Sequence, residues 1–167
     1  MADVRKFSLR YDAQEDRIAW DMEHDDGRRT RLWLTQRLAN RLVKALIPLV
    51  EKAAAVPPGA PEQAAAVQSF EQAAAMSGFG SVSPVIPSDD AALGLVRSVQ
   101  IAPKAPGMIL TFTLGANAEQ ILKLDSPAVR QALAVLRGLY QAAGWPADFW
   151  PRWLDAPGAP ETRAALN

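Results

Sequence analysis

The sequence predicts an α+β fold built from two related units, in each of which three antiparallel strands are followed by one helix. Residues 4–52 and 96–142 follow the same order of alternating and helical apolar patterns. The matching apolar positions are Phe7, Leu9, Ile18, Trp20, Met22, Leu32 and Leu34 in the first stretch and Val99, Ile101, Leu110, Phe112, Leu114, Leu122 and Leu124 in the second. Such a repeat sets the architecture. Because one small sheet with a helix is marginally stable, we expect the units to share a core, related by an approximate twofold, or to form a homodimer.

The alignment of the two units contains an internal check. It uses a difference of 92 in residue number for the first two strands and of 90 from the third strand onward. The change is even, so it turns no apolar face outward. Pro48 and Gly138 then occupy equivalent positions in the two helices.

We expect one structural domain, which suits a chain of 167 residues, divided into four segments. Residues 1–52 form the first unit and residues 94–144 the second. Residues 53–93 connect them through one helix and a loop rich in Gly, Ser and Pro. Residues 145–167 form a tail rich in tryptophan.

The strands of the first unit are predicted by side chains that alternate between apolar and polar. Residues 24–28 fit a three-residue hairpin loop with Gly27 in the left-handed conformation. This loop places Trp20 opposite Leu32, so the apolar faces of both strands agree, whereas a two-residue loop would put them on opposite faces.

The same register predicts a ladder of charges on the outer face, with an acidic middle strand between two basic strands. A second hairpin around residues 13–16 completes it. The expected neighbours are Asp21 with Arg31, Glu23 with Arg29, Lys6 with Glu23, and Ser8 with Asp21.

The helix of the first unit is predicted to begin after Thr35, a good N-cap residue. Its buried stripe is expected to contain Leu38, Leu42, Ala45, Leu46 and Leu49, and the opposite side Arg37, Arg41 and Lys44. Pro48 removes a backbone hydrogen bond, so the helix should bend or end near it.

The helix of the second unit has stronger start and stop signals. Asp125 provides the cap, Pro127 suits the first turn, and Gly144 suits the end. The expected buried stripe consists of Val129, Ala132, Leu133, Leu136 and Tyr140.

The connecting segment contains an alanine-rich stretch, residues 62–76, that favours a helix. Val67, Phe70 and Ala74 are its expected apolar seam. Residues 77–90 predict an irregular loop, which is either a spacer or a place where function resides.

The tail contains three of the five tryptophans within residues 145–153. It either covers this protein's own sheets and helices or docks into a partner. Large exposed apolar patches are rare on soluble monomers, which favours packing on the chain itself.

Composition excludes several classes of function. Lys plus Arg and Asp plus Glu are both 18, so no net field attracts nucleic acid or membrane. The chain has no cysteine, which excludes disulfides, thiolate metal sites and cysteine nucleophiles. No secretion signal and no membrane span is present, so we expect a cytoplasmic protein without membrane contact.

One group of possible metal ligands stands out, formed by Asp21, Glu23, His24, Asp25 and Asp26. Two of its carboxylates are already paired with arginines in the expected register, and adjacent aspartates are common in turns. No calcium-loop spacing is present. We therefore expect no metal here.

No catalytic or cofactor pattern is evident either. His24, the only histidine, is expected in a surface turn without the oriented partner that catalysis needs. Ser81 lacks the nucleophile-elbow and phosphate-loop patterns. We expect no cofactor and no enzymatic activity. A deep pocket lined by Asp12, Glu15, Asp16 and Asp89 would reverse this expectation.

The leading hypothesis is a non-catalytic interaction protein, an adaptor or accessory subunit that binds a protein partner. Aromatic and basic surface is suited to such contact. The candidate partner-binding residues are Arg29, Arg31, Trp33, Arg37, Arg41, Trp150 and Trp153.

The alternative hypothesis is single-stranded nucleic-acid binding by the face of Arg29, Arg31 and Trp33, since such sites interleave basic and aromatic side chains. The duplicated order of strands and helix is similar in topology to PUR- and Whirly-type nucleic-acid-binding folds. No sequence motif of those families is present, and no residue role is transferred. Against this hypothesis, the acidic strand can neutralise the arginines, and the neutral chain offers no long-range attraction.

Overall fold

The computed structural model describes residues 2–54, 59–80, 83–86 and 91–155. Its strands are β1 (Val4–Asp12), β2 (Arg17–His24), β3 (Arg29–Leu34), β4 (Ala92–Leu95), β5 (Ser98–Lys104), β6 (Gly107–Thr113) and β7 (Glu119–Asp125). The α-helices are α1 (Gln36–Ala53), α2 (Pro61–Ser77) and α3 (Ser126–Ala143), and the 3-10 turns are η1 (Gly115–Asn117) and η2 (Arg152–Asp155). This order confirms the predicted α+β class, with a helix between two β-β-β-α units.

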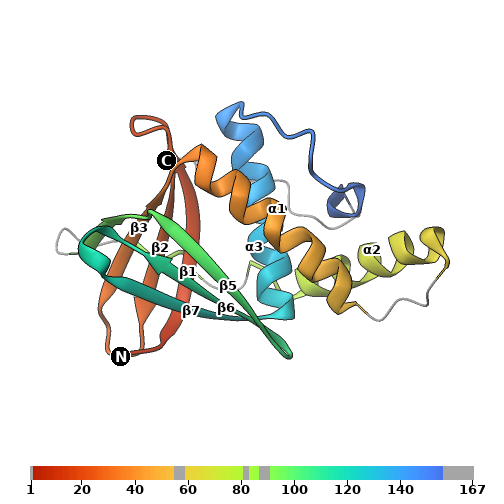
Figure 1. Ribbon diagram of the computed structural model, residues 1–167, viewed down its shortest axis with the longest axis horizontal. Coiled ribbons are helices and arrows are strands. Elements are labelled where there is room, and N and C mark those ends of the chain that lie inside the picture. Colours follow the sequence, from red (N-terminus) through yellow and green to blue (C-terminus); the bar gives the residue numbers. More distant parts are fainter. Residues whose placement is uncertain (1, 55–58, 81–82, 87–90, 156–167) are drawn as a thin grey trace.

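The strands form two sheets (Figure 1). The first sheet has the order β1-β2-β3-β4 and the second the order β5-β6-β7. The sequence analysis did not predict β4, which runs parallel to β3. Directly after β4, the Val96 amide donates to Trp33 O in the first sheet and the Arg97 amide to Thr113 O in the second, at 3.0 and 2.8 Å. The chain therefore crosses between the sheets at this point.

The register of the first sheet is the predicted one. The observed partners include Trp20 with Leu32, Asp21 with Arg31, Glu23 with Arg29, Lys6 with Glu23, and Ser8 with Asp21. Gly27 has φ +82°, and the loop of residues 25–27 has the predicted length, closed by a bond from the His24 amide to Arg28 O. One detail of the charge ladder differs: Arg5 rather than Lys6 binds Glu23, because the register of β1 shifts between Val4 and Lys6.

The two units have matching strand order and register, but the predicted alignment between them needs one correction. Trp20 pairs with Leu32 and Leu110 pairs with Leu122, and both pairs are related by a difference of 90 in residue number. Trp20 is therefore equivalent to Leu110, and its predicted match with Phe112 is wrong. The first hairpin of the second unit is shorter, with residues 105–106 in place of 13–16. The two-residue difference leaves every apolar side chain on its face.

The two helices follow the same numbering. α1 and α3 each contain 18 residues, and their caps, Thr35 and Asp125, also differ by 90. Thr35 Oγ1 accepts from the Leu38 amide at 3.3 Å, and Asp125 Oδ1 accepts from the Ala128 amide at 2.8 Å. Gly144 ends α3 with φ +67°, as predicted.

The structure narrows one prediction about α1 and contradicts another. The helix does not end at Pro48 but continues to Ala53, so of the two predicted outcomes only a bend at Pro48 stays open. Ala45 is exposed, whereas the predicted stripe placed it inside. The buried face is turned slightly and consists of Ala39, Leu42, Val43, Leu46, Ile47 and Val50. The stripe of α3 is confirmed, since all five predicted residues are buried.

Both units share one core. Trp20 and Phe112 are fully buried, and their ring centroids lie 5.3 Å apart, edge to face, where the sheets meet. α3 also packs against β1 and α1 against β5, so each helix contacts the sheet of the other unit. Figure 1 shows both helices on one side of the crossed sheets, with α2 beyond the end of α1. No helix in these described segments is long and apolar enough to cross a membrane.

Candidate interaction surfaces

α2 forms because its sequence is rich in alanine and begins with Pro61, which suits a first helical turn. Its orientation is the opposite of the predicted one. The side chains that face the protein belong to Gln68, Gln72, Ala75 and Met76. Phe70 is 72% exposed, Ala74 is exposed and Val67 is only half-buried. Two of the three residues of the predicted apolar seam, Phe70 and Ala74, therefore face outward.

Hydrogen bonds hold the buried side of α2. Gln68 Nε2 donates to Glu51 O at 3.0 Å, and Gln72 Nε2 donates to Arg130 O at 3.2 Å. In return, Gln131 Nε2 of α3 donates to Ala75 O at 2.7 Å. Buried amides are stable only when bonded, and most of these polar groups find partners on α1 and α3.

Arg130 is the centre of this attachment. It is 4% exposed, and its guanidinium donates to Gln68 Oε1 at 2.6 Å. The guanidinium also lies 5.1 Å from the ring centroid of Trp153. Burial lowers the pKa of Arg130, and the described residues include no carboxylate in an ion pair with it. The buried charge is stabilised by amide oxygens, by an aromatic ring and by the nearby charges of Glu71 and Glu51, which oppose the effect of burial on the pKa. These contacts fix how α2 sits on α3.

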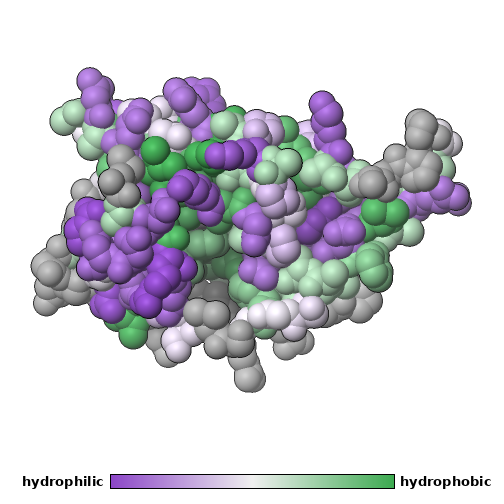
Figure 2. Space-filling model, turned by 90° about the horizontal axis from the view of Figure 1, so that it is seen from below, coloured by the Kyte–Doolittle hydropathy of each residue, from purple (hydrophilic) through white to green (hydrophobic). Residues whose placement is uncertain are grey.

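The outward side of α2 is apolar and weakly acidic. Ala66, Phe70 and Ala74 are exposed four residues apart along one helix face. The only charged residues of the helix are Glu62 and Glu71, so it carries no cation. Figure 2 shows green and pale side chains over this end of the molecule, to the right, with isolated hydrophilic ones between them.

A basic stripe runs along the exposed side of α1. It contains Arg37, Arg41, Lys44, Ala45 and Pro48, all of which are exposed. In the part of the chain that the structure describes, Arg37 and Arg41 make no ion pair. Lys44 lies 5.0 Å from the ring centroid of Phe149 in the C-terminal segment. Two of the predicted partner-binding arginines therefore carry a charge that no carboxylate within the described segments matches.

The other two predicted arginines are neutralised. Arg31 donates to both carboxylate oxygens of Asp21, at 2.6 and 3.0 Å, and Asp21 is only 1% exposed. The Arg31 guanidinium also lies 5.4 Å from the ring centroid of Trp33, which is half-buried. Arg29 pairs with Glu23 at 3.3 Å. This face is an ion-pair network in which Asp21 also pairs with Arg10 at 3.5 Å.

A short segment covers part of that face. Val85 is 5% exposed, its amide donates to Ser8 Oγ at 3.1 Å, and Arg29 Nη1 donates to Ile86 O at 2.8 Å. This covering explains why the neighbouring carboxylates are buried on the side predicted to face water. Of the predicted loop at 77–90, Ser81 and Asp89 lie outside the described residues.

The C-terminal segment packs on the protein itself as far as Asp155. Trp145 and Trp153 are 8% and 7% exposed, and Trp150 is half-buried. The buried ring of Tyr140 contacts the rings of Trp145, Phe149 and Trp150 edge to face. Trp153 Nε1 donates to Glu51 Oε1 at 2.9 Å. Of the two predicted tail residues, only Trp150 retains appreciable exposed surface.

The structure also locates the residues considered for chemistry. His24 is buried, with 1% of its surface exposed, so its predicted place in a surface turn is wrong. Its Nε2 lies 3.1 Å from Thr30 Oγ1 and its Nδ1 lies 3.3 Å from Ala2 O. Arg5 and Arg29 hold the pKa of Glu23 below its usual range. The described residues contain no cluster of three or more ligands that could hold a metal ion.

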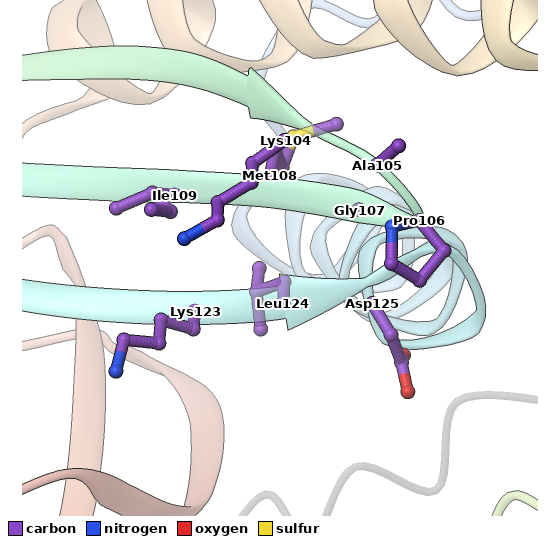
Figure 3. A pocket seen from close by; sticks show the side chains of 9 residues that line it. All are labelled: Lys104, Ala105, Pro106, Gly107, Met108, Ile109, Lys123, Leu124 and Asp125. Carbon is purple, nitrogen blue, oxygen red and sulfur yellow. The ribbon is translucent and has the colours of Figure 1, made fainter.

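One shallow pocket of about 230 Å³ lies beside the β5–β6 turn. Its polar side chains belong to Lys104, Lys123 and Asp125, and Figure 3 shows that they do not converge on a common point. Lys123 is paired with Asp3 at 2.8 Å. This arrangement offers no pair of groups placed for catalysis.

The chain matches no protein-family model, and no curated protein or solved structure shows significant similarity to it. Sequence reasoning missed the exposed side of α2, although one signal was present: Gln68 and Gln72 lie four residues apart, on a side of the helix away from Phe70.

Proposed function

We propose that the chain is a non-catalytic interaction protein, an adaptor or accessory subunit, that binds a protein partner through the exposed side of α2. The proposal places it in the cytoplasm, with which the lack of cysteine is compatible. The partner presents an apolar groove with a basic rim, because the exposed side of α2 combines Phe70 and alanines with Glu62 and Glu71.

The observation that supports this proposal is the inverted burial of α2. A surface helix normally buries its aromatic side chain and leaves glutamines in water. Here Gln72 is fully buried and Phe70 is 72% exposed. Burial of a phenylalanine side chain contributes about 2 kcal/mol, so a partner that covers Phe70 would gain this free energy of binding. Exposed aromatic residues on a preformed helix are typical anchors of protein interfaces.

The test is affinity purification from the native host with three tagged forms of the full chain. Wild type and Ile86→Ser should recover the same protein, whereas Phe70→Ser should lose it. Ile86 is a matched control because it is also 72% exposed but lies over the first sheet. The recovered protein is then purified, and its affinity for each form is measured by calorimetry. Equal affinity for all three forms would remove α2 from the proposal.

Single-stranded nucleic-acid binding remains the second candidate, supported by the exposed Arg37 and Arg41, which make no ion pair with any residue that the structure describes. It no longer draws on Arg29 and Arg31, whose charges are matched by Glu23 and Asp21. Titration with labelled oligonucleotides at two salt concentrations tests it. Binding that weakens with salt and is lost in Arg37→Ala/Arg41→Ala would support this candidate. Absence of binding at micromolar protein would exclude it.

A further inference from the structure

The two equivalent helices differ in what covers them. In α3, Gln131 bonds to α2, Ala134 and Val135 are half-buried, and Gly138 is buried. The equivalent residues of α1, at a difference of 90, are Arg41, Lys44, Ala45 and Pro48, and all four are exposed. The face of α3 on which Gln131 binds α2 is therefore exposed at the equivalent positions of α1, where Lys44 lies against the ring of Phe149.

The exposed face of α1 and the exposed side of α2 are complementary. α1 presents cations around the small apolar surfaces of Ala45 and Pro48. α2 presents the side chain of Phe70 between exposed alanines, with Glu62 and Glu71 as its only charges. The helices have nearly the same length, 18 and 17 residues, so the two stripes can run alongside each other.

We infer that α2 of one copy docks on the basic stripe of α1 of a second copy, which gives a homodimer. Each copy carries both surfaces, so a twofold-symmetric pair makes the contact twice and closes without further growth. α2 then lies between its own α3 and the α1 of the second copy. This inference rests on the proposed function, since it names the partner of the same α2 surface.

Sedimentation velocity over a range of protein concentrations tests the inference with the full chain. Wild type and Ile86→Ser should form a dimer with the same dissociation constant. Phe70→Asp and Arg41→Glu should each weaken it by roughly 30-fold or more, as expected for anchors at an interface centre. All these side chains are exposed, and circular dichroism verifies that each variant is folded.

Mixing the two weakened variants provides a sharper measurement. A pair of one Phe70→Asp chain and one Arg41→Glu chain retains one intact contact, in which wild-type α2 meets wild-type α1. The mixture should therefore form a heterodimer more tightly than either variant forms a homodimer. A wild-type chain that stays monomeric, or a dimer that neither substitution weakens, would overturn the inference. A different result would contradict the proposed function: the partner recovered by affinity purification would bind Phe70→Ser as tightly as wild type.

Discussion

α1 and α3 occupy equivalent places in the two units, yet one is exposed along its outer side and the other is enclosed. Both have 18 residues and a side-chain N-cap, and both pack on the sheets in the shared core. α2 and the C-terminal segment touch α1 through Glu51 and Lys44, whereas they enclose much more of the outer side of α3. The two matching units therefore define the core, whereas the segments outside them define the surface.

α1 and α3 also carry different residues at the equivalent positions that hold the covering segments. Asn40 of α1 corresponds to Arg130 of α3, and Val50 corresponds to Tyr140. Arg130 holds α2 in place through Gln68. The ring of Tyr140 packs against the aromatic rings of the C-terminal segment, and its hydroxyl donates to Asn40 Oδ1 at 2.7 Å. The second helix therefore has the residues that attach the additional segments.

The largest expected effect comes from the core that joins the units. Trp20→Ala should lower the free energy of unfolding by about 3–5 kcal/mol, and Leu110→Ala, at the equivalent position, by about 2–5 kcal/mol. Both side chains are fully buried, and Trp20 contacts Phe112 across the sheets. Chemical denaturation followed by tryptophan fluorescence and by circular dichroism should show one shared transition. Two separate transitions would mean that the units have independent cores.

The second largest loss of stability is expected from removing the contacts that attach α2 to α3. Arg130→Ala should cost about 3 kcal/mol, because it leaves the buried Gln68 side chain without its donor and removes the packing on Trp153. Hydrogen exchange should accelerate in α2 while the amides of β2 and β6 keep their protection. The equivalent change in α1, Asn40→Ala, serves as the matched control, and it should leave exchange in α2 unchanged.

The two helix caps should have similar, smaller effects. Thr35→Ala and Asp125→Ala each remove one bond to an amide of the first turn and should cost about 1 kcal/mol. Thermal unfolding of each variant measures this. A cap in one unit that proves much more costly than the other would show that the two helices contribute unequally to the shared core.

Tyr140→Phe is expected to have a small effect at neutral pH, about 1 kcal/mol, from loss of the bond to Asn40. Its main effect concerns alkaline pH. Burial raises the pKa of the Tyr140 hydroxyl, so the folded state keeps a proton that the unfolded chain releases near pH 10. The contribution of the protonated Tyr140 hydroxyl to the free energy of unfolding is complete below about pH 10 and is lost as pH rises further. The phenylalanine variant should therefore lose less stability between pH 9 and pH 11 than wild type, in denaturant titrations across that range.

Sequence reasoning predicted what depends on local patterns. The Gly27 loop determined the first-sheet register, and Asp125 and Gly144 determined the bounds of α3. The features that it missed depend on distant residues. β4 is four residues long and pairs with a strand about 60 residues earlier. The side of α2 that is buried depends on Arg130, which lies on another helix.

The burial of His24 also depends on residues that are not its neighbours in the sequence. Its place after an acidic strand and before a turn suggested exposure, but contacts to Ala2 and Thr30 bury it. The candidate site was also only half predictable. Arg37 and Arg41 are exposed on the predicted side of α1, whereas Arg29 and Arg31 are held by carboxylates, an outcome that the predicted register already allowed.

Thiol labelling tests the orientation of α2 most directly, because the chain has no cysteine of its own. Single variants Phe70→Cys and Met76→Cys are treated with a maleimide at protein concentrations low enough to keep the chain monomeric. Since Phe70 is 72% exposed and Met76 is 6% exposed, the cysteine at position 70 should react at least tenfold faster than the one at position 76. Faster labelling at position 76 would mean that α2 buries Phe70, and the exposed surface on which the proposed interactions depend would not exist.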